Sequence, residues 1–172
     1  MTIDVSSLSI VFYPNVILRQ KASEVEPNDI NVQEVARRMI ELMLESNGVG
    51  LAAPQVGLPW RLFVTQDLEN KGKGIVWMNP ILETIDDTVE IEEEGCLSLP
   101  EIRADIRRPV GVRISGFNVE GKAHSQESDD FIARVWQHEN DHLDGVLIID
   151  KMSAMDKLVN RKIIKNLERI AK

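Results

Sequence analysis

Residues 134 to 145 have the sequence RVWQHENDHLDG, and the interpretation of the whole chain starts from this stretch. It holds His138 and His142, two of the three histidines, with Glu139 directly after the first. On an α-helix, residues four apart lie about 40° apart around the axis, so both imidazoles share one face. The pattern HExxH therefore predicts a helix that holds a metal ion and keeps a carboxylate beside it for proton transfer.

A structural role fits the same stretch. The two histidines would then lie on a polar helix face, with acidic ion-pair partners at Glu139, Asp141 and Asp144. Charged helix faces of this kind are common on soluble proteins, so the pattern alone leaves both interpretations open.

A catalytic metal site needs a third protein ligand and one open position. HExxH peptidases take that ligand from downstream, where the final helix of this chain offers only Glu168. Upstream, EGCLS (94–98) contains the only thiol, Cys96. A lone cysteine is more often a small buried hydrophobe, but on a strand that faces the helix it would complete a Cys/His/His set.

Composition points to an ordinary globular protein. The 172 residues are 43% hydrophobic and 28% charged, which fits one domain over residues 1–172. No basic leader followed by an apolar run opens the chain, and no apolar stretch approaches the roughly 20 residues that cross a bilayer. A single cysteine excludes an internal disulfide, and we expect a cytoplasmic protein. The net charge of −8 argues against a DNA-binding surface, and we expect no membrane partner.

Apolar periodicity predicts three helices, over residues 28–45, 129–143 and 155–171. Strand patterns are predicted at 61–65, 74–78, 81–91 and 109–117, and a loop or irregular strand at 48–59. Helices and strands are segregated along the chain. This arrangement favours an α+β fold in which mostly antiparallel strands pack around a central HExxH helix, with one helix N-terminal and one C-terminal to them.

The last predicted helix has two distinct faces. One is apolar: Met155, Val159, Ile163, Leu167 and Ile170. The opposite stripe is basic: Lys157, Arg161, Lys165, Arg169 and Lys172. A basic stripe on an acidic protein either attracts an anionic partner or is simply a solvated face.

Three segments, in this order, resemble the motifs of the peptide deformylases: GVGLAAPQ (48–55), EGCLS (94–98) and QHENDHLDG (137–145). YPNVILRQKASEV (13–25) is also similar to the N-terminal segment of that family, so the resemblance spans nearly the whole chain. It implies a metal-dependent hydrolase that removes the N-formyl group from the initiator methionine of nascent polypeptides and releases formate.

The resemblance also implies roles for single residues. The metal ligands would be Cys96, His138 and His142, and the metal in the cell Fe²⁺, with Zn²⁺, Ni²⁺ or Co²⁺ able to replace it. Glu139 would be the catalytic acid and base. The side-chain amide of Gln55 and the backbone N–H of Leu97 would stabilise the oxyanion that develops on the formyl oxygen.

Substrate contacts are expected around these groups. Gly50 would let the peptide backbone approach closely, and Glu94 is placed with the substrate-binding residues. The methionine side chain needs an apolar slot, for which the candidates are Val49, Leu51, Phe131, Val135 and the aliphatic stem of Arg134. Plain core packing is the alternative for Leu51 and Val135. Two positions depart from what many relatives carry: Glu92 replaces an apolar residue and Asp130 a glycine.

Three functional hypotheses remain. The resemblance favours a deformylase that contacts the ribosome through its basic C-terminal helix. A peptidase that cuts internal amides is the second, and it predicts a third ligand downstream of His142. A metal-binding but inactive relative that acts as a ribosome-associated interaction protein is the third, although Glu139, Gln55 and Cys96 are all present.

Overall fold

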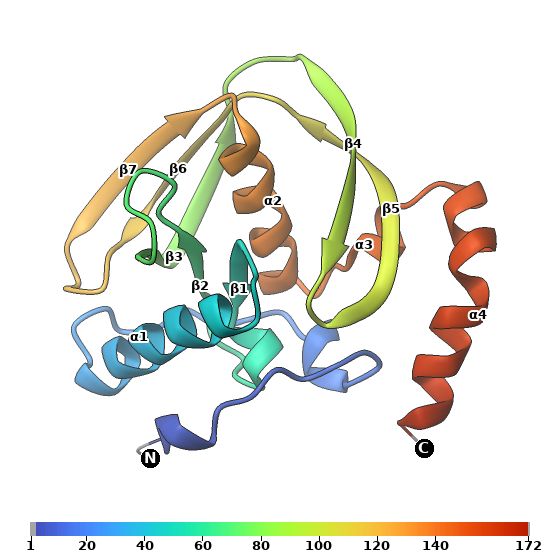
Figure 1. Cartoon of the computed structure of the whole chain (residues 1–172). Coiled ribbons are helices and arrows are strands. Elements are labelled where there is room, and N and C mark those ends of the chain that lie inside the picture. The colour runs from blue at the N-terminus through green and yellow to red at the C-terminus, as the bar shows by residue number, and fades with distance from the viewer. Residues whose placement is uncertain (1–2, 172) are drawn as a thin grey trace.

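The computed structural model describes residues 3–171 (Figure 1). Its α-helices are α1 (Ile30–Glu45), α2 (Phe131–Leu143), α3 (Ile148–Lys151) and α4 (Ala154–Ile170). Its strands are β1 (Gly50–Ala52), β2 (Leu62–Gln66), β3 (Gly74–Thr84), β4 (Val89–Cys96), β5 (Leu99–Pro109), β6 (Val112–Phe117) and β7 (Ala123–Ser128). Short 3-10 helices are η1 (Val5–Ser7), η2 (Val16–Arg19) and η3 (Ala53–Val56).

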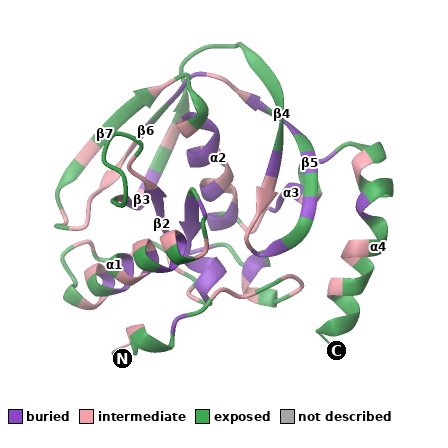
Figure 2. Cartoon of the chain, in the orientation of Figure 1, coloured by how far each residue is buried: buried purple, intermediate pink, exposed green. Residues whose placement is uncertain are grey.

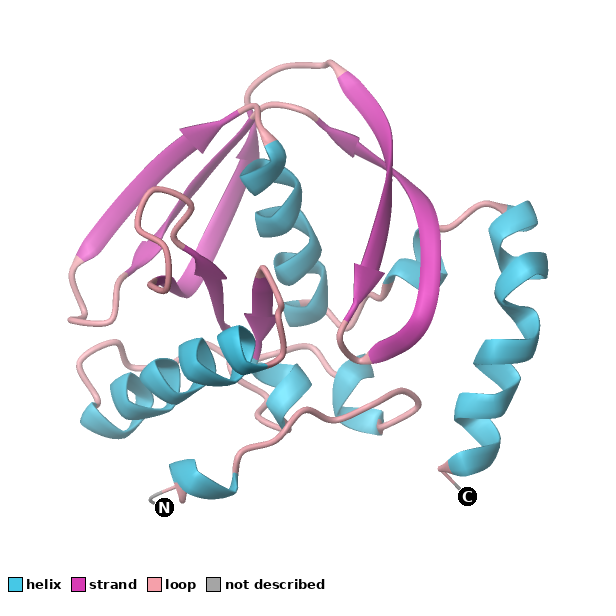
Figure 3. Cartoon of the chain, viewed as in Figure 1, coloured by secondary structure: helices cyan, strands magenta, loops and turns pink. Residues whose placement is uncertain are grey.

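Two antiparallel sheets enclose the central helix. The larger has the strand order β1-β2-β3-β6-β7, and the smaller is the β4–β5 ribbon. Every pairing between these strands is antiparallel. Helix α2 lies between the larger sheet and the ribbon (Figure 3). The α+β prediction with mostly antiparallel strands is confirmed.

Helix α1 forms where its apolar spacing predicts it. The Asp29 side chain caps its N-terminus by accepting from the backbone N–H of Asn31. The buried face is the predicted one: Val32, Val35, Ala36, Met39, Leu42 and Met43. This face packs against β1 and β2, and it forms the largest hydrophobic cluster of the described residues.

Helix α2 begins at Phe131, two residues later than predicted, and ends at Leu143 as predicted. The chain leaves it through Gly145, whose φ of 71° lies in the left-handed region that favours glycine. A Cβ there would also lie 2.5 Å from the carbonyl oxygen of Arg19, so the position has no room for a side chain. The exit of the HExxH helix is thus fixed against η2.

Several strand predictions need correction. The pattern over residues 81–91 is not one strand, because β3 ends at Thr84 and β4 begins at Val89. The pattern over 109–117 likewise divides, since Pro109 ends β5 and Val112 starts β6. Strand β7 (AHSQES) was not predicted, because its polar and mostly exposed residues show no apolar alternation.

The predicted apolar face of the last helix is only partly buried. Met155, Val159 and Ile170 are 67%, 69% and 71% exposed, and Figure 2 shows α4 mostly exposed beside β5. Only a narrow stripe contacts the ribbon: Asn160, Ile163, Ile164 and Leu167. The physical reason is that α4 packs on one side of a single ribbon rather than across a sheet.

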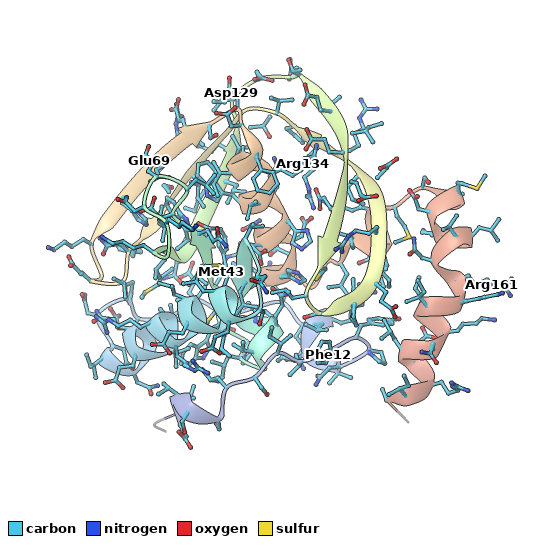
Figure 4. The ribbon with its side chains drawn as sticks, in the orientation of Figure 1. Phe12, Met43, Glu69, Asp129, Arg134 and Arg161 are labelled. Carbon is cyan, nitrogen blue, oxygen red and sulfur yellow. The ribbon has the colours of Figure 1, made fainter. Side chains whose placement is uncertain are left out.

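The basic stripe of α4 faces outward, as expected. Lys157, Arg161, Lys165 and Arg169 are exposed, and Arg161 points away from the body in Figure 4. Lys172 lies outside the described residues. Within residues 3–171, no helix combines the length and apolar character needed to cross a membrane.

Candidate metal centre and active site

The HExxH residues lie on the inward side of α2. Glu139 and His142 are buried, and His138 is largely covered. The ring centroids of His138 and His142 are 5.1 Å apart. The i, i+4 spacing therefore brings the two imidazoles together, as the sequence predicts.

Cys96, in the β4–β5 ribbon, lies close to both histidines. It is the last residue of β4, at the turn into β5, where the register shifts between Gly95 and Cys96. Its Sγ lies 3.4 Å from His142 Nε2, and one donor atom each of Cys96, His138 and His142 lies within 4.8 Å of the others. A thiolate and two imidazoles at this separation suit one tetrahedral ion and leave a fourth position open.

The downstream alternative has no support in the geometry. Glu168, the ligand that a peptidase-type site would need, lies on α4 and accepts a hydrogen bond from the Tyr13 hydroxyl at 3.0 Å. The structural alternative fails too, because Asp141 pairs with Arg108 and Asp144 with Arg61, not with the histidines.

Glu94 occupies a place that the sequence did not predict. Its carboxylate is buried and turned towards α2, where Oε2 lies 2.9 Å from His138 Nδ1. Arg108 donates to both carboxylate oxygens, at 2.6 and 3.0 Å, and Arg134 donates to Oε1 at 2.9 Å. These contacts suit a role in positioning His138, and Glu94 also lines the cavity, where a contact with substrate is expected.

Arg108 was missed by sequence reasoning. Its side chain is only 2% exposed, and it also donates to Asp141 on α2 at 2.8 Å. Along β5, Ile102, Ala104 and Ile106 are buried at alternate positions, and Arg108 continues that alternation. The period of two would have shown that Arg108 points inward, where an arginine needs acidic partners.

Charges around the site move the pKa values of its groups in opposite directions. Burial alone would raise the pKa of Glu94, but hydrogen bonds from His138 and Arg108 hold it well below its ordinary value. Burial would lower the pKa of His138, yet hydrogen bonds with Cys96 and Glu94 raise it to about 10. Burial and the positive charges of His138 and Arg108 keep the pKa of His142 well below its ordinary value. A metal ion bound here therefore has to displace a proton from His138.

Glu139 has the features of a proton-transfer group. It is 4% exposed, and its Oε2 has no hydrogen-bond partner among the described residues. Burial raises its pKa to about 7, against the lowering effect of His138. A carboxylate with a pKa near neutrality can both accept and return a proton.

Gln55 faces the same centre from η3. Its Oε1 accepts from the backbone N–H of Ala52 at 2.9 Å, which fixes the orientation of the amide. Its Nε2 then points to Cys96 Sγ at 3.6 Å and Ser98 Oγ at 3.2 Å. Leu97, in the turn after Cys96, lines the cavity beside it. The donor of Gln55 is thus aimed at the centre rather than at solvent.

A cavity of about 490 Å³ opens onto Gln55, Cys96, Leu97, His138 and Glu139. Its lining includes the expected substrate residues Val49, Gly50, Phe131, Arg134 and Val135, together with Glu94. Leu51 is not among them; it is fully buried in the core beside α1, so the core-packing alternative holds for it.

Arg134 lines the cavity, and its guanidinium is held elsewhere. Its guanidinium is held by Glu92, Glu94 and the carbonyl oxygens of Glu90 and Ile106, and Figure 4 shows it between α2 and β4. The aliphatic part is therefore free to line an apolar slot.

Fold and site together define a class of protein. The features are a buried HExxH helix, a thiol from a neighbouring ribbon, an amide donor and an open cavity. These are the parts of a metal-dependent hydrolase whose cavity is lined in part by apolar residues.

Comparison with known proteins gives the particular family. The polypeptide deformylase family model matches residues 7–158. Peptide deformylase of Borreliella burgdorferi is 44% identical over 155 residues, 90% of this chain and 92% of that one. Peptide deformylase of Thermotoga maritima is 42% identical over 91% of this chain and 93% of that one.

Solved structures agree. The Plasmodium falciparum peptide deformylase complex with inhibitor has a TM-score of 0.85 at 37% identity and covers 94% of this chain and 99% of that one. Arabidopsis thaliana peptide deformylase 1B in complex with an inhibitor has a TM-score of 0.89 at 36% identity, covering 95% and 92%.

The chain belongs to the polypeptide deformylase family. It is a hydrolase that removes the N-formyl group from the initiator methionine of nascent polypeptides.

Proposed function

We propose that the deformylation is carried out by the residues gathered at the cavity. Cys96, His138 and His142 hold the metal ion, Glu139 transfers protons, and the oxyanion donors are Gln55 and the backbone N–H of Leu97. The observation that carries this proposal is the meeting of the three donor atoms within 4.8 Å, at a cavity whose wall includes Cys96, His138 and Glu139.

The chemistry follows from these positions. A metal ion held here would supply Lewis acidity, which lowers the pKa of water and polarises the formyl oxygen. Glu139 accepts a proton from the attacking water, whose oxygen bonds to the formyl carbon. The amide donor of Gln55 stabilises the negative charge that develops on the formyl oxygen. Glu139 returns the proton to the amine as the C–N bond breaks, which leaves formate and a free N-terminus.

The test is formate release from formyl-Met-Ala-Ser by metal-loaded protein, with Glu139→Ala as the key variant and the exposed, remote Glu120→Ala as its control. We expect formate from the wild type and the control, and nearly none from Glu139→Ala. No formate from the wild type, or equal formate from Glu139→Ala, would refute the assignment.

We propose Fe²⁺ as the metal in the cell, with Zn²⁺, Ni²⁺ or Co²⁺ able to occupy the site. One thiolate with two imidazoles suits several of these ions, so the donor set supports a group of metals and the resemblance favours iron. Elemental analysis of protein purified without oxygen tests the choice. Zinc in stoichiometric amount and no iron would contradict it.

We propose that the basic stripe of α4 docks on ribosomal RNA. Its support is the exposed row of cations on an otherwise acidic protein, next to the exposed apolar residues Met155, Leu158 and Val159. Reversing the charge of Lys157, Arg161 and Lys165 should abolish co-sedimentation with ribosomes at low salt. The control reverses three exposed lysines elsewhere, Lys71, Lys73 and Lys122. Equal co-sedimentation of both triple variants would refute docking by α4.

We further propose that residues 1–172 form one catalytic domain that works in the cytoplasm, where chains beginning with formylmethionine are made. Its support is that the donor atoms come from both the ribbon and α2, so neither part holds the site alone. Cooperative unfolding in urea, with far-UV and tryptophan signals coinciding, is the expected result. Two separate transitions would contradict a single domain.

A further inference from the structure

Gly50 lies against the carboxylate of Glu139. It is the first residue of β1, buried and paired with Thr65 of β2. A Cβ placed on Gly50 would lie 2.5 Å from Glu139 Oε1 and 2.8 Å from both Cδ and Cγ. These separations are well inside van der Waals contact. The end of the Glu139 side chain therefore occupies the space that any other residue at position 50 would fill.

Backbone conformation does not explain the glycine. The glycines with left-handed φ angles are Gly57, Gly72, Gly121 and Gly145, and Gly50 is not among them. Its pairing with Thr65 gives it the extended conformation of an ordinary strand residue, which alanine also adopts. What position 50 requires is the absence of a side chain.

Few polar contacts hold the Glu139 carboxylate. Its Oε2 is buried without a hydrogen-bond partner among the described residues. The backbone of Glu139 is fixed within α2, but the carboxylate at the end of the side chain depends on what it packs against. Gly50 provides that surface, and the β1–β2 pairing fixes where it stands.

We propose that Gly50 is a positioning residue for Glu139, in addition to any contact it makes with the peptide. This inference rests on the proposed function, in which Glu139 transfers the protons. A side chain at position 50 pushes the carboxylate away from the reacting atoms, and a displacement of about 1 Å in a catalytic group is enough to lower the rate about a hundredfold.

The kinetic test is a double-mutant cycle of Gly50→Ala and Glu139→Asp on metal-loaded protein with formyl-Met-Ala-Ser. Aspartate is one methylene shorter, so its carboxylate withdraws from the space that the alanine methyl enters. We expect Gly50→Ala to lower kcat about 10- to 100-fold with little change in KM. In the Glu139→Asp background, the same substitution should lower kcat less than about threefold.

A matched pair controls for the added methyl group itself. Gly74 is also in the large sheet, and the three atoms nearest to its new Cβ all belong to the side chain of Ile40 on α1. The effects of Gly74→Ala and Glu139→Asp should therefore multiply. If the effects of Gly50→Ala and Glu139→Asp multiply as well, or if Gly50→Ala acts on KM alone, the proposal is overturned.

A second cycle measures stability and needs no activity. Gly50→Ala should lower the urea midpoint of the metal-free wild type, and in the Glu139→Ala background the loss should be at most about half as large. If Gly50→Ala folds only when Glu139 is also replaced by alanine, the proposal is supported. If Gly50→Ala fails to fold in both backgrounds, or lowers the urea midpoint equally in both, the proposal is overturned. An inactive wild type would refute the proposed function without changing this stability result.

Discussion

Replacing Glu94 by glutamine should lower both the metal affinity and the free energy of unfolding, and the two losses can be measured separately. Gln keeps an oxygen for His138 Nδ1 but removes the negative charge between Arg108 and Arg134. Mutation of an outer partner of a metal-binding histidine typically lowers metal affinity about 10- to 100-fold. That range corresponds to about 1.4–2.7 kcal/mol of binding free energy.

The stability loss follows from the partners that remain. Breaking a buried ion pair costs about 3–5 kcal/mol when it leaves a buried charge unpaired. Arg108 keeps Asp141, and Arg134 keeps Glu92 and two backbone carbonyls. We therefore expect Glu94→Gln to lower the free energy of unfolding of metal-free protein by about 3 kcal/mol, the lower end of that range.

Acid dependence provides an internal check. The pKa of Glu94 is lowered in the folded state. The contribution of the ionised carboxylate to the free energy of unfolding is therefore fully present above the ordinary pKa of 4.5 and declines as the pH falls below it. The difference in free energy of unfolding between wild type and Glu94→Gln should therefore become smaller in acid.

Zinc affinity by competition with a chelator and urea unfolding of metal-free protein measure the two effects. Glu93→Gln is the control, because that neighbouring side chain is exposed, and it should change stability by less than about 0.5 kcal/mol. Zinc affinity and stability of Glu94→Gln equal to those of Glu93→Gln would refute the positioning role of Glu94.

Three further outcomes are expected. Burial raises the pKa of Glu139 from 4.5 to about 7, so its ionised form opposes folding increasingly as the pH rises through that range. Metal-free Glu139→Gln should thus be more stable than wild type by about 1–3 kcal/mol near pH 8, and equal urea midpoints would contradict this. Gln55→Leu removes the proposed oxyanion donor and should lower kcat about 10²- to 10³-fold, whereas a change in KM alone would show that Gln55 only binds substrate. Zinc affinity should rise between about pH 6 and pH 9 because His138, with a pKa raised to about 10, must release its proton; a flat profile would contradict that proton displacement.

Local apolar periodicity predicted much of the helical part of the fold. The six buried positions of α1 follow directly from helical spacing, and the i, i+4 histidines of α2 needed only a regular helix to converge. The meeting of Cys96 with those histidines depends on how the ribbon packs on α2. Residue spacing alone did not decide whether Cys96 is a metal ligand or a buried apolar residue, and the resemblance to the deformylases favoured a ligand.

The errors have a common physical cause. The place of Glu94 was missed because it depends on long-range packing. The β4–β5 register sets Ala104 opposite Glu94 and Arg108 opposite Glu90, so the contact with Glu94 is made by the long Arg108 side chain, and His138 comes from α2. The face of α4 was misjudged because helical amphipathicity predicts a buried stripe but not what covers it. Strand β7 was missed because pairing with β6, rather than apolar alternation, makes it a strand.

The position of α4 beside β5 also bears on self-association. Within the described residues, β5 pairs only with β4, so its other edge would present backbone groups to any extended chain nearby. Asn160 of α4 is buried there and donates to the carbonyl oxygen of Arg103 at 2.9 Å, while Ile163 and Leu167 cover the apolar cluster behind it. Open strand edges are templates for edge-to-edge aggregation, and natural proteins cover them. By shielding this edge, α4 protects the ribbon that carries Cys96 from pairing with other chains, whether or not its basic stripe has a partner.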